Sequence, residues 1–550
     1  MFRILTLLLA LQAPAPDPLE LPADLVLVEG TVATMKKAGD FAQAVAVRGR
    51  RIALVGTNEQ VRALIGPETK VLSLDGKLLL PGLVDSHVHF LSGSLSLDQL
   101  DVSRADLPEI QKRLTERIQS RPEEAWVVGR GWSYAAIPGR LPNRTDLDAV
   151  SRDKPVFLVA YDGHTAWVNS NALELSGITA ATPQPEFGEI VHDETGEPSG
   201  LLKEGGAMSL VRSRIPEIPR EAKRRALLRG LAEARRLGLT GIQNASGSEE
   251  ELGLYQELDR EGLLTLRTIS ALRMTPDLTD SDLESYERLR KRYSSGNVRA
   301  GTVKGFIDGV VETHTAAMLE PYADDPSQLG ETTMPVEDLE RLVLELDRRR
   351  FQIYVHSIGD RGVRATLDAF DRARNENPAW DRRHRIEHIE VISKDDISRF
   401  GSSGTIAGMQ ATHWFPTPQS EDGVWARNVG RARLPLAFNW QSIADSGGRL
   451  SFGSDWPVAT LNPLVGLRNA TARKDQKLDA YRALRAYTID AAYASNSENE
   501  LGSISPGKLA DLVVLSEDVF SIDPAEIHQV EALLTIFDGR VVYRSESSPK

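Results

Sequence analysis

The stretch PGLVDSHVHF, residues 81–90, ends an apolar run on two histidines that are one residue apart. The Pro-Gly corner and the apolar residues around it are typical of a short buried strand. Because residues i and i+2 of a strand point to the same face, His87 and His89 aim two imidazoles at one point, together with Asp85. Two neutral imidazoles suit a divalent metal. An isolated pair of this kind also occurs at strand ends that contact only backbone or water, so partners elsewhere in the chain must decide.

Composition limits the class of protein. The chain has 550 residues, 41% of them apolar, which predicts several folded units and a sizeable core. The formal net charge of -13 argues against nucleic acid as a partner and provides no polybasic patch for an anionic membrane. The absence of cysteine excludes disulfides, thiolate ligands and a cysteine nucleophile. Any metal must therefore be held by His, Asp, Glu or a modified Lys.

The first residues, MFRILTLLLALQAPAPDP, have the pattern of a secretory signal. Arg3 is a minimal basic region, residues 4–11 are the apolar core, and small residues follow. We expect residues 1–16 to be a signal peptide and the protein to be exported, either periplasmic or secreted. Proline follows both Ala13 and Ala15 and should hinder a signal peptidase, so the sequence does not decide whether the signal is cleaved. The apolar core is too short to span a bilayer, and we expect no integral membrane span elsewhere in the chain.

Two kinds of sequence pattern occur along the chain, β-rich segments and segments in which strands and helices alternate, and together they predict an α/β fold of several parts. Short β-rich runs occupy residues 17–80 and 500–550, and we expect them to form one composite β-sandwich from both termini. Strand-length apolar runs alternate with helical segments over residues 81–499, which predicts a (β/α)8 TIM-like barrel. Residues 91–215 are too long for one connection and contain strands of their own. We read them as a subdomain inserted after barrel strand 1, on the substrate side.

Polar residues follow several of the predicted barrel strands. These are Lys304 in GTVKGFIDG, His356 in IYVHSIGD, His388 in RIEHIEV and Asp455 in SFGSDWP. Catalytic groups of a barrel come from the carboxyl ends of its strands, so we expect these side chains to meet the two histidines of the first strand at one mouth. The joint pattern is hard to explain as core packing.

At this point the chain resembles a known family. The ordered motifs PGLVDSHVH, GHTAWVNSNAL, KGFIDG, VHSIGD, RIEH, MQATH, GSDWPV and GSISPGKLADLVVL resemble the amidohydrolase superfamily. Within it, they are similar to the amidohydrolase-3 group of N-substituted formamide deformylase-like and YtcJ-like proteins. The resemblance covers nearly the whole chain after the signal. It implies a binuclear site, in which His87, His89 and Asp455 hold the inner metal and His356 and His388 hold the outer one.

The resemblance further implies that Lys304 bridges both metals as a carbamate formed with CO2. An ammonium cannot ligate a cation, whereas a carbamate is a bidentate carboxylate. If Lys304 is instead a solvated or ion-paired lysine, the site holds one metal. We therefore expect one or two divalent ions. Zinc suits imidazole and carboxylate ligands best here, with manganese, iron and cobalt as alternatives.

The implied function is hydrolysis of a non-peptide C–N bond in a small-molecule substrate: an amide, a cyclic amide or an N-substituted formamide. Metal-activated hydroxide would attack the carbonyl, and Asp455 would carry the proton to the leaving nitrogen. An esterase, lactonase or phosphotriesterase on the same metals is the nearest alternative, because fold does not choose among these reactions. A non-catalytic binding protein is a third alternative. The sequence does not decide whether the protein forms a homo-oligomer.

Five further residues are candidates for the site. His164, in YDGHTAWVNS, and His413, in MQATH, are expected to donate a hydrogen bond to the substrate carbonyl or oxyanion, with a structural histidine as the alternative. Asp308, Glu204 and Trp132 are candidates for substrate contact. For the two carboxylates structural support is the alternative, and for the tryptophan it is packing.

Overall fold

The computed structural model describes residues 21–414 and 423–548. The expected signal peptide, residues 1–16, lies outside the described residues. No helix of the described part is long and apolar enough to cross a membrane.

The centre of the molecule is an eight-stranded sheet in which all neighbouring strands are parallel. Two hydrogen bonds join the segment after the last strand to the end of the first, from Asp455 N to His87 O at 2.7 Å and from His89 N to Trp456 O at 2.9 Å. The sheet therefore curls into the predicted barrel. Its strands are β8 (Leu83–Val88), β15 (Leu239–Asn244), β16 (Arg267–Arg273), β17 (Val298–Phe306), β18 (Gln352–Ser357), β19 (Arg385–His388), β20 (Ile406–Met409) and β21 (Arg449–Phe452).

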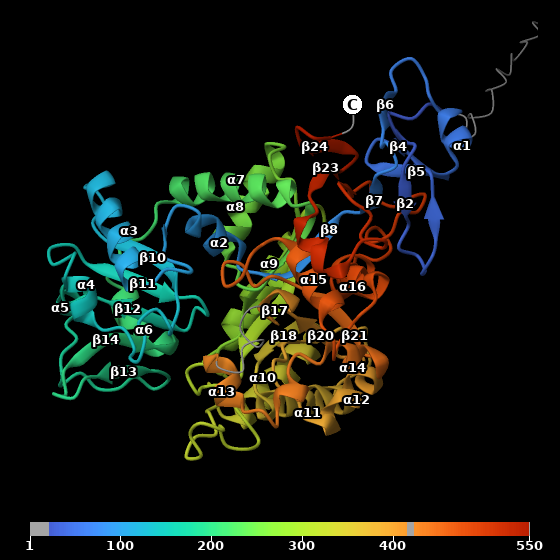
Figure 1. The fold of residues 1–550 in the computed structure, drawn as a ribbon. Coiled ribbons are helices and arrows are strands. Elements are labelled where there is room, and N and C mark those ends of the chain that lie inside the picture. Colours follow the sequence, from blue (N-terminus) through green and yellow to red (C-terminus); the bar gives the residue numbers. More distant parts are fainter. Residues whose placement is uncertain (1–20, 415–422, 549–550) are drawn as a thin grey trace, which may run out of the picture.

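Amphipathic helices cover the outside of this barrel (Figure 1). The apolar face of α10, for example, buries Leu339, Leu342 and Leu346, which recur at helical spacing. The helices that follow successive strands are α7 (Arg220–Arg236), α8 (Glu249–Arg260), α9 (Asp280–Arg292), α10 (Val336–Arg348), α11 (Asp360–Glu376), α12 (Lys394–Ser403), α14 (Trp440–Asp445), α15 (Pro463–Ala472), α16 (Ala480–Tyr487) and α17 (Ile489–Ala494).

Both ends of the chain build a β-sandwich, as expected. Strand β7 pairs antiparallel with β22, so that Pro81 lies opposite Leu512. Leu27 and Val45 of one sheet share an apolar core with Leu79 and Val514 of the other. One sheet has β5 (Arg51–Gly56), β4 (Ala44–Arg48), β1 (Leu25–Val28) and β6 (Lys70–Ser73); the other has β24 (Arg540–Arg544), β23 (Ala532–Phe537), β22 (Leu512–Leu515), β7 (Leu78–Pro81), β2 (Thr31–Ala33) and β3 (Phe41–Ala42).

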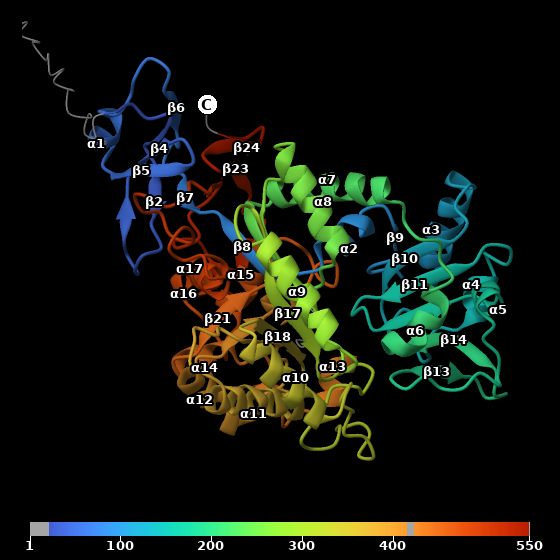
Figure 2. The ribbon, with the colours of Figure 1, turned by 180° about the vertical axis from the view of Figure 1, so that it is seen from behind.

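Residues 100–212, which lie between β8 and α7 in the chain, form a separate lobe beside the barrel (Figures 1 and 2). Its sheet has apolar cores on both faces, one with Ile110 and Leu114 of α3, the other with Ala207 and Val211 of α6. The expected insertion after the first barrel strand is therefore confirmed. The sheet contains β13 (Glu189–His192), β14 (Pro198–Lys203), β12 (Thr165–Val168), β11 (Val156–Ala160), β10 (Val127–Trp132) and β9 (Leu100–Asp101); the helices are α3 (Leu107–Ser120), α4 (Arg144–Asp148), α5 (Ser170–Ser176) and α6 (Glu204–Arg212).

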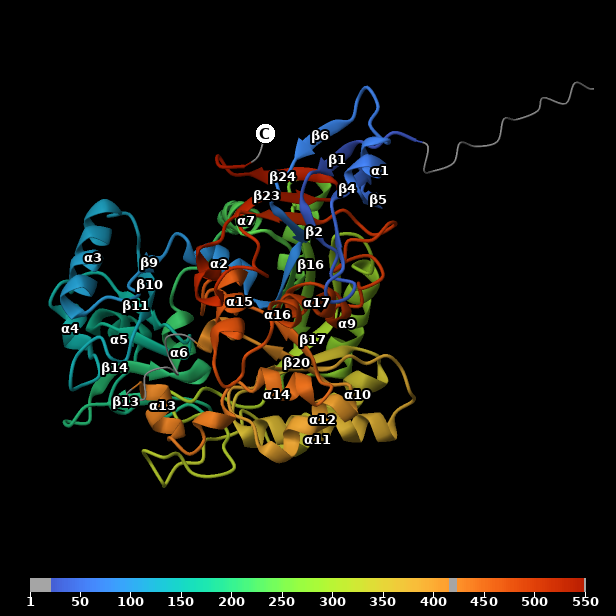
Figure 3. The ribbon, with the colours of Figure 1, turned by 45° about the vertical axis from the view of Figure 1, so that its right-hand side comes forward.

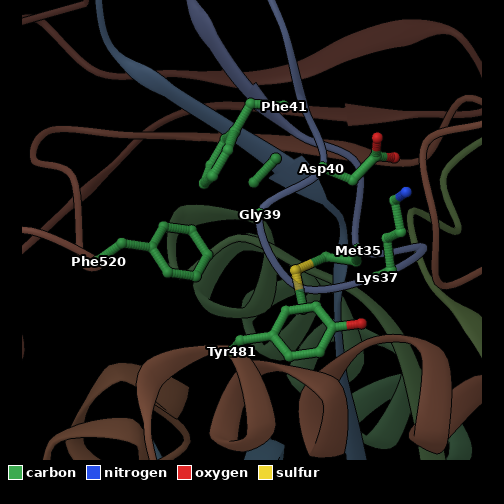
Figure 4. A pocket seen from close by; sticks show the side chains of 8 residues that line it. Met35, Lys37, Gly39, Asp40, Phe41, Tyr481 and Phe520 are labelled. Atoms are coloured by element: carbon green, nitrogen blue, oxygen red, sulfur yellow. The ribbon is translucent and has the colours of Figure 1, made fainter.

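A small apolar pocket lies between the sandwich and the barrel. Phe41 and Phe520 face each other edge to face with ring centroids 5.6 Å apart, and Met35 and Tyr481 lie beside them (Figure 4). Its volume is about 180 Å³. None of its lining residues comes from the carboxyl end of a barrel strand, so it is not the candidate active site.

The sandwich is joined to the barrel through a largely buried arginine, Arg267 of β16. Its guanidinium binds Asp511 through Nε (2.6 Å to Oδ2) and Nη2 (2.9 Å to Oδ1), and Nη2 also contacts Asp538 at 2.6 Å. The three side chains are 12%, 3% and 8% exposed. Because these side chains are buried, loss of Arg267 would leave the charge of Asp511 uncompensated. Figure 3 shows the C-terminal strands β23 and β24 above the barrel.

Arg267→Ala is expected to lower the free energy of unfolding by about 3 kcal/mol, because it leaves the buried carboxylate of Asp511 without its cation, whereas Asp538 keeps Arg50, whose Nε lies 2.7 Å from Asp538 Oδ2. Denaturant unfolding of the purified protein measures this. The matched control is Arg220→Ala, which removes an ion pair to Glu257 whose two side chains are each 45% exposed; there we expect a change of about 0–1 kcal/mol. Equal effects of the two substitutions would contradict the role of Arg267.

Candidate metal centre

The two histidines of the opening stretch meet an aspartate that follows the last strand of the barrel, at the same carboxyl end. His87 belongs to β8, His89 is the N-cap residue of α2 (Phe90–Ser96), and Asp455 follows β21. Asp455 Oδ1 lies 3.1 Å from His89 Nε2 and 3.6 Å from His87 Nε2. One potential ligand atom from each of the three residues lies within 4.8 Å of the others. They could therefore share one cation.

The opposite ring nitrogens of both histidines are occupied. His87 Nδ1 makes a short contact with Glu387 Oε2, and His89 Nδ1 lies 2.7 Å from Ser246 Oγ. Partners of this kind orient the imidazoles of metal sites and leave the other nitrogen for the ion. Within the described part of the chain, His87 Nε2 and Asp455 Oδ1 are buried without a hydrogen-bond partner. Buried polar atoms are rarely left unsatisfied, so this donor set fits a cation.

A second group shares Asp455 and adds His388 and His413, again with one potential ligand atom of each within 4.8 Å of the others. His388 ends β19 and is 3% exposed, and its ring centroid lies 4.3 Å from that of His356 and 4.9 Å from that of His87. His356 Nε2 is 3.1 Å from Gly309 O, which leaves Nδ1 as its free nitrogen. The structure thus brings all the expected imidazoles to one mouth.

Lys304 points into the same cluster from β17. It is 2% exposed, and its Nζ has no hydrogen-bond partner among the described residues. Burial lowers the pKa of Lys304 to about 8, although the charges of Glu387 and Asp455 act in the opposite direction. A lowered pKa favours the neutral amine, which is the form that reacts with CO2. The side chain is therefore suited to the carbamate that the resemblance implies.

His87, His356, His388 and Asp455 have the charge states that a divalent metal requires. Burial and the charge of Lys304 lower the pKa of His87 to about 4, and burial holds the pKa of His356 and His388 well below the ordinary value. The pKa of Asp455 lies well below its usual range, because contacts with the histidines outweigh burial. Neutral imidazoles around an ionised carboxylate are the ligands of a divalent ion.

His164 reaches the mouth from the inserted lobe. Its ring centroid lies 6.0 Å from that of His356, and its Nδ1 lies 2.8 Å from Glu204 Oε2. Burial opposes the charged form, but the charge of Glu204 and this hydrogen bond raise the pKa of His164 to about 9. Glu204 is 2% exposed, and its Oε1 accepts hydrogen bonds from Thr313 (2.9 Å) and Thr315 (2.6 Å) of the barrel. It orients His164 and has no free oxygen for a substrate.

Two other candidates are held by structural contacts, although Asp308 Oδ1 lies 3.8 Å from His356 Nε2. The carboxylate of Asp308 is 1% exposed and accepts three backbone N–H bonds, from Ala317, Ile358 and Gly359. Trp132 is fully buried in the core of the inserted lobe, and its Nε1 donates to a backbone carbonyl. These placements favour the alternatives of structural support for Asp308 and packing for Trp132.

Three residues around the metal cluster were not anticipated. Glu387 and Glu390 flank His388 in RIEHIE, and Ser246 follows β15. A carboxylate next to a strand-end histidine is a signal that could have found the first two. No pattern distinguishes Ser246 from other loop serines, because its role depends on which strand lies beside β8.

Comparisons with known proteins agree with this geometry. The model described as "Amidohydrolase family" matches residues 70–543. Protein LONG AFTER FAR-RED 3 of Arabidopsis thaliana is 33% identical over 96% of this chain and 92% of its own length. The putative amidohydrolase YtcJ of Bacillus subtilis is 31% identical (94% and 98%), and the N-substituted formamide deformylase of Arthrobacter pascens is 29% identical (96% and 99%).

A solved structure has the same fold. An uncharacterized metal-dependent hydrolase from Pyrococcus horikoshii superimposes with a TM-score of 0.73 at 25% identity, covering 91% of this chain and 99% of that one. The barrel, the ordered motifs and the family match together confirm the resemblance drawn from the sequence. The chain therefore belongs to the amidohydrolase family, hydrolases that act on carbon–nitrogen bonds other than peptide bonds.

Proposed function

We propose that this protein hydrolyses the C–N bond of a small amide, cyclic amide or N-substituted formamide at a divalent-metal centre. The observation that carries the proposal is the buried cluster of oriented imidazoles around Asp455, with ligand atoms that have no partner in the described part of the chain. The similarity to a formamide deformylase over nearly the whole chain supports the choice of bond.

His87, His89 and Asp455 would hold one cation, and His388 with His356 or a modified Lys304 would contribute to a second. Zinc fits this set of nitrogen and oxygen donors. When bound, such an ion lowers the pKa of a coordinated water and polarises a carbonyl oxygen. The barrel's own side chains must then orient the amide and move protons.

Asp455 is placed to carry the proton. Its Oδ1 faces the two histidines of the first strand, which leaves Oδ2 to accept a proton from the attacking water. An amide nitrogen leaves only after it is protonated, so Asp455 returns the proton to that atom. The low pKa of this carboxylate keeps it ionised before the reaction.

His164 is placed to bind the carbonyl oxygen. Glu204 occupies its Nδ1, and the raised pKa keeps both ring nitrogens protonated near neutral pH. Nε2 therefore donates toward the mouth, where it would stabilise negative charge that develops on oxygen during attack.

Matched substrates test the proposal. An amide, the corresponding ester and a phosphotriester with the same substituents are compared with the metal-loaded protein and with protein treated with a chelator. We expect metal-dependent cleavage of the amide or formamide. Cleavage of the ester or phosphotriester alone would contradict it. A protein that contains no metal and stays inactive after metal and bicarbonate are supplied would instead be a binding protein.

Asp455→Asn is expected to lower kcat by about 10²–10⁴-fold, the usual contribution of a positioned proton-transfer group, because the amide cannot shuttle the proton. An amide oxygen still faces the cations, so metal content per chain should stay close to that of the parent. Steady-state kinetics and elemental analysis measure the two effects. Full activity in this variant would rule out the proton shuttle.

Lys304→Ala is expected to reduce the metal content from about two ions per chain, as in two-metal hydrolase sites, to one or none. The reason is loss of the bridging carbamate. Elemental analysis of protein expressed with added zinc measures this, and Lys37→Ala, at an exposed lysine, is the control. The same metal content in parent and Lys304→Ala would mean that Lys304 does not bridge.

A further inference from the structure

We propose that Arg130 of the inserted lobe binds a carboxylate group of the substrate. The substrate is then a small amide or formamide that carries a carboxylate, for example an N-formyl amino acid. This inference rests on the proposed function, because it names the substrate class of the same site. It follows from where Arg130 lies and from the lack of a partner for its guanidinium among the described residues.

Arg130 lies at the edge of the lobe's sheet that faces the mouth. It is near the carboxyl end of β10, which runs parallel to β11. The segment after β11 contains Tyr161, whose N–H donates to Trp132 O of β10 at 3.1 Å. The same segment contains His164, whose ring centroid lies 6.0 Å from that of His356. Because parallel strands end at the same edge of a sheet, Arg130 and His164 come from one edge.

A β-bulge separates the side chain of Arg130 from the core of the lobe. The pairing of β10 with β11 shifts its register between Arg130 and Trp132, at Gly131, whose φ of +98° favours glycine. Regular alternation would place Arg130 and Trp132 on the same face of the sheet. The bulge instead places Trp132 in the core on one face, whereas Arg130 stays on the face of Val128 and Val159.

The charges that act on Arg130 show where its guanidinium points. Burial lowers the pKa of Arg130 to about 10, so the group stays charged near neutral pH. The charge of Asp455 opposes this shift, and it does so more strongly than the charge of Asp101, although Asp101 lies opposite Arg130 on the neighbouring strand β9. Charges interact more strongly at short range and away from water. The guanidinium therefore extends from the lobe toward the mouth.

None of the described carboxylates neutralises Arg130. Its half-buried side chain makes no hydrogen bond, ion pair or ring contact with a described residue. Asp101 accepts a backbone N–H bond of 2.8 Å instead, and Asp455 faces the histidines of the first barrel strand. Asp162 accepts from a backbone N–H at 2.9 Å and from the Tyr134 hydroxyl at 2.8 Å. A partly desolvated charge without a partner is costly, so this position suits an anionic ligand.

The acidic groups at the boundary between lobe and barrel do not oppose such a ligand. Glu204 is paired with His164, whose raised pKa keeps it protonated. Glu312 accepts a hydrogen bond of 2.8 Å from the Tyr161 hydroxyl. Burial and the charge of Asp162 raise the pKa of Glu312, which favours its neutral form. Arg130 therefore keeps its own charge for the substrate.

A carboxylate matches this guanidinium in shape and in charge. The planar fork of an arginine donates two parallel hydrogen bonds to the two oxygens of a carboxylate. One carboxylate also balances one guanidinium, whereas a phosphate monoester carries about two negative charges near neutral pH. In a formamide the acyl part is a single hydrogen, so the carboxylate belongs to the amine part of the molecule.

Paired substrates test the inference. A panel of N-formyl amino acids is compared with the corresponding N-formyl amines, which lack only the carboxylate, on the metal-loaded protein. We expect the parent to prefer the acids. Arg130→Gln should lower kcat/KM for the acids by about 10–100-fold, mainly through KM, and leave the neutral compounds close to the parent. Arg130→Lys, which keeps the charge and loses the fork, should lie between them. Arg152→Gln, at an exposed arginine of the same lobe, is the matched control.

Binding measurements separate this inference from the proposed function. Isothermal titration of the same compounds into parent and variants needs no turnover. A parent that cleaves neither series overturns the proposed cleavage of formamides, whereas binding that requires the carboxylate and is lost in Arg130→Gln still supports the role of Arg130. A parent that does not distinguish the two series, or an Arg130→Gln variant that keeps the parent's preference, overturns the role of Arg130 alone. If Arg130→Gln does not fold, as judged by circular dichroism, Arg130→Lys decides: a reduced preference supports the inference and a parent-like preference refutes it.

Discussion

The structure depends on one buried arrangement of charge inside the barrel. Arg385 Nε donates to Glu387 Oε1 at 2.6 Å, and the other carboxylate oxygen contacts His87 Nδ1. All three side chains are at most 1% exposed, so a lone charge here would be costly. Because Arg385 compensates Glu387, the pKa of that carboxyl falls to about 2 despite burial. The contact links β19 to β8 across the barrel and directs His87 Nε2 at Asp455, so the metal-facing geometry is part of the core.

The inserted lobe is joined to the site in a similar way, by hydrogen bonds to carboxylates at the boundary between lobe and barrel. Glu204 connects His164 of the lobe to Thr313 and Thr315 of the barrel, and Tyr161 donates to Glu312 at 2.8 Å across the same boundary. The contacts that dock the lobe on the barrel therefore also position His164. A loop with no such anchor would have to order this imidazole at each encounter with substrate, which costs conformational entropy.

The parts of the site that were predictable follow from periodicity. Alternation along a strand places His87 and His89 together, and parallel strands in a barrel present their carboxyl ends to one mouth, which groups them with Asp455. The spacing of residues along the chain does not show whether a side chain is buried. It also does not show which group contacts the second nitrogen of an imidazole. Asp308 and Trp132 therefore looked like candidates for substrate contact, although the first bonds to backbone and the second packs in the lobe's core.

By itself, the sequence determined the α/β barrel, the composite sandwich, the inserted lobe and the family, because these depend on patterns along the chain. Tertiary structure alone decided which nitrogen of each histidine faces the cluster. Glu387 orients His87, Glu390 lies behind His413, and the carbonyl of Gly309 occupies His356 Nε2. These partners are brought together by closure of the barrel, and a side chain's hydrogen-bond partner from a distant strand leaves no periodic trace in the sequence.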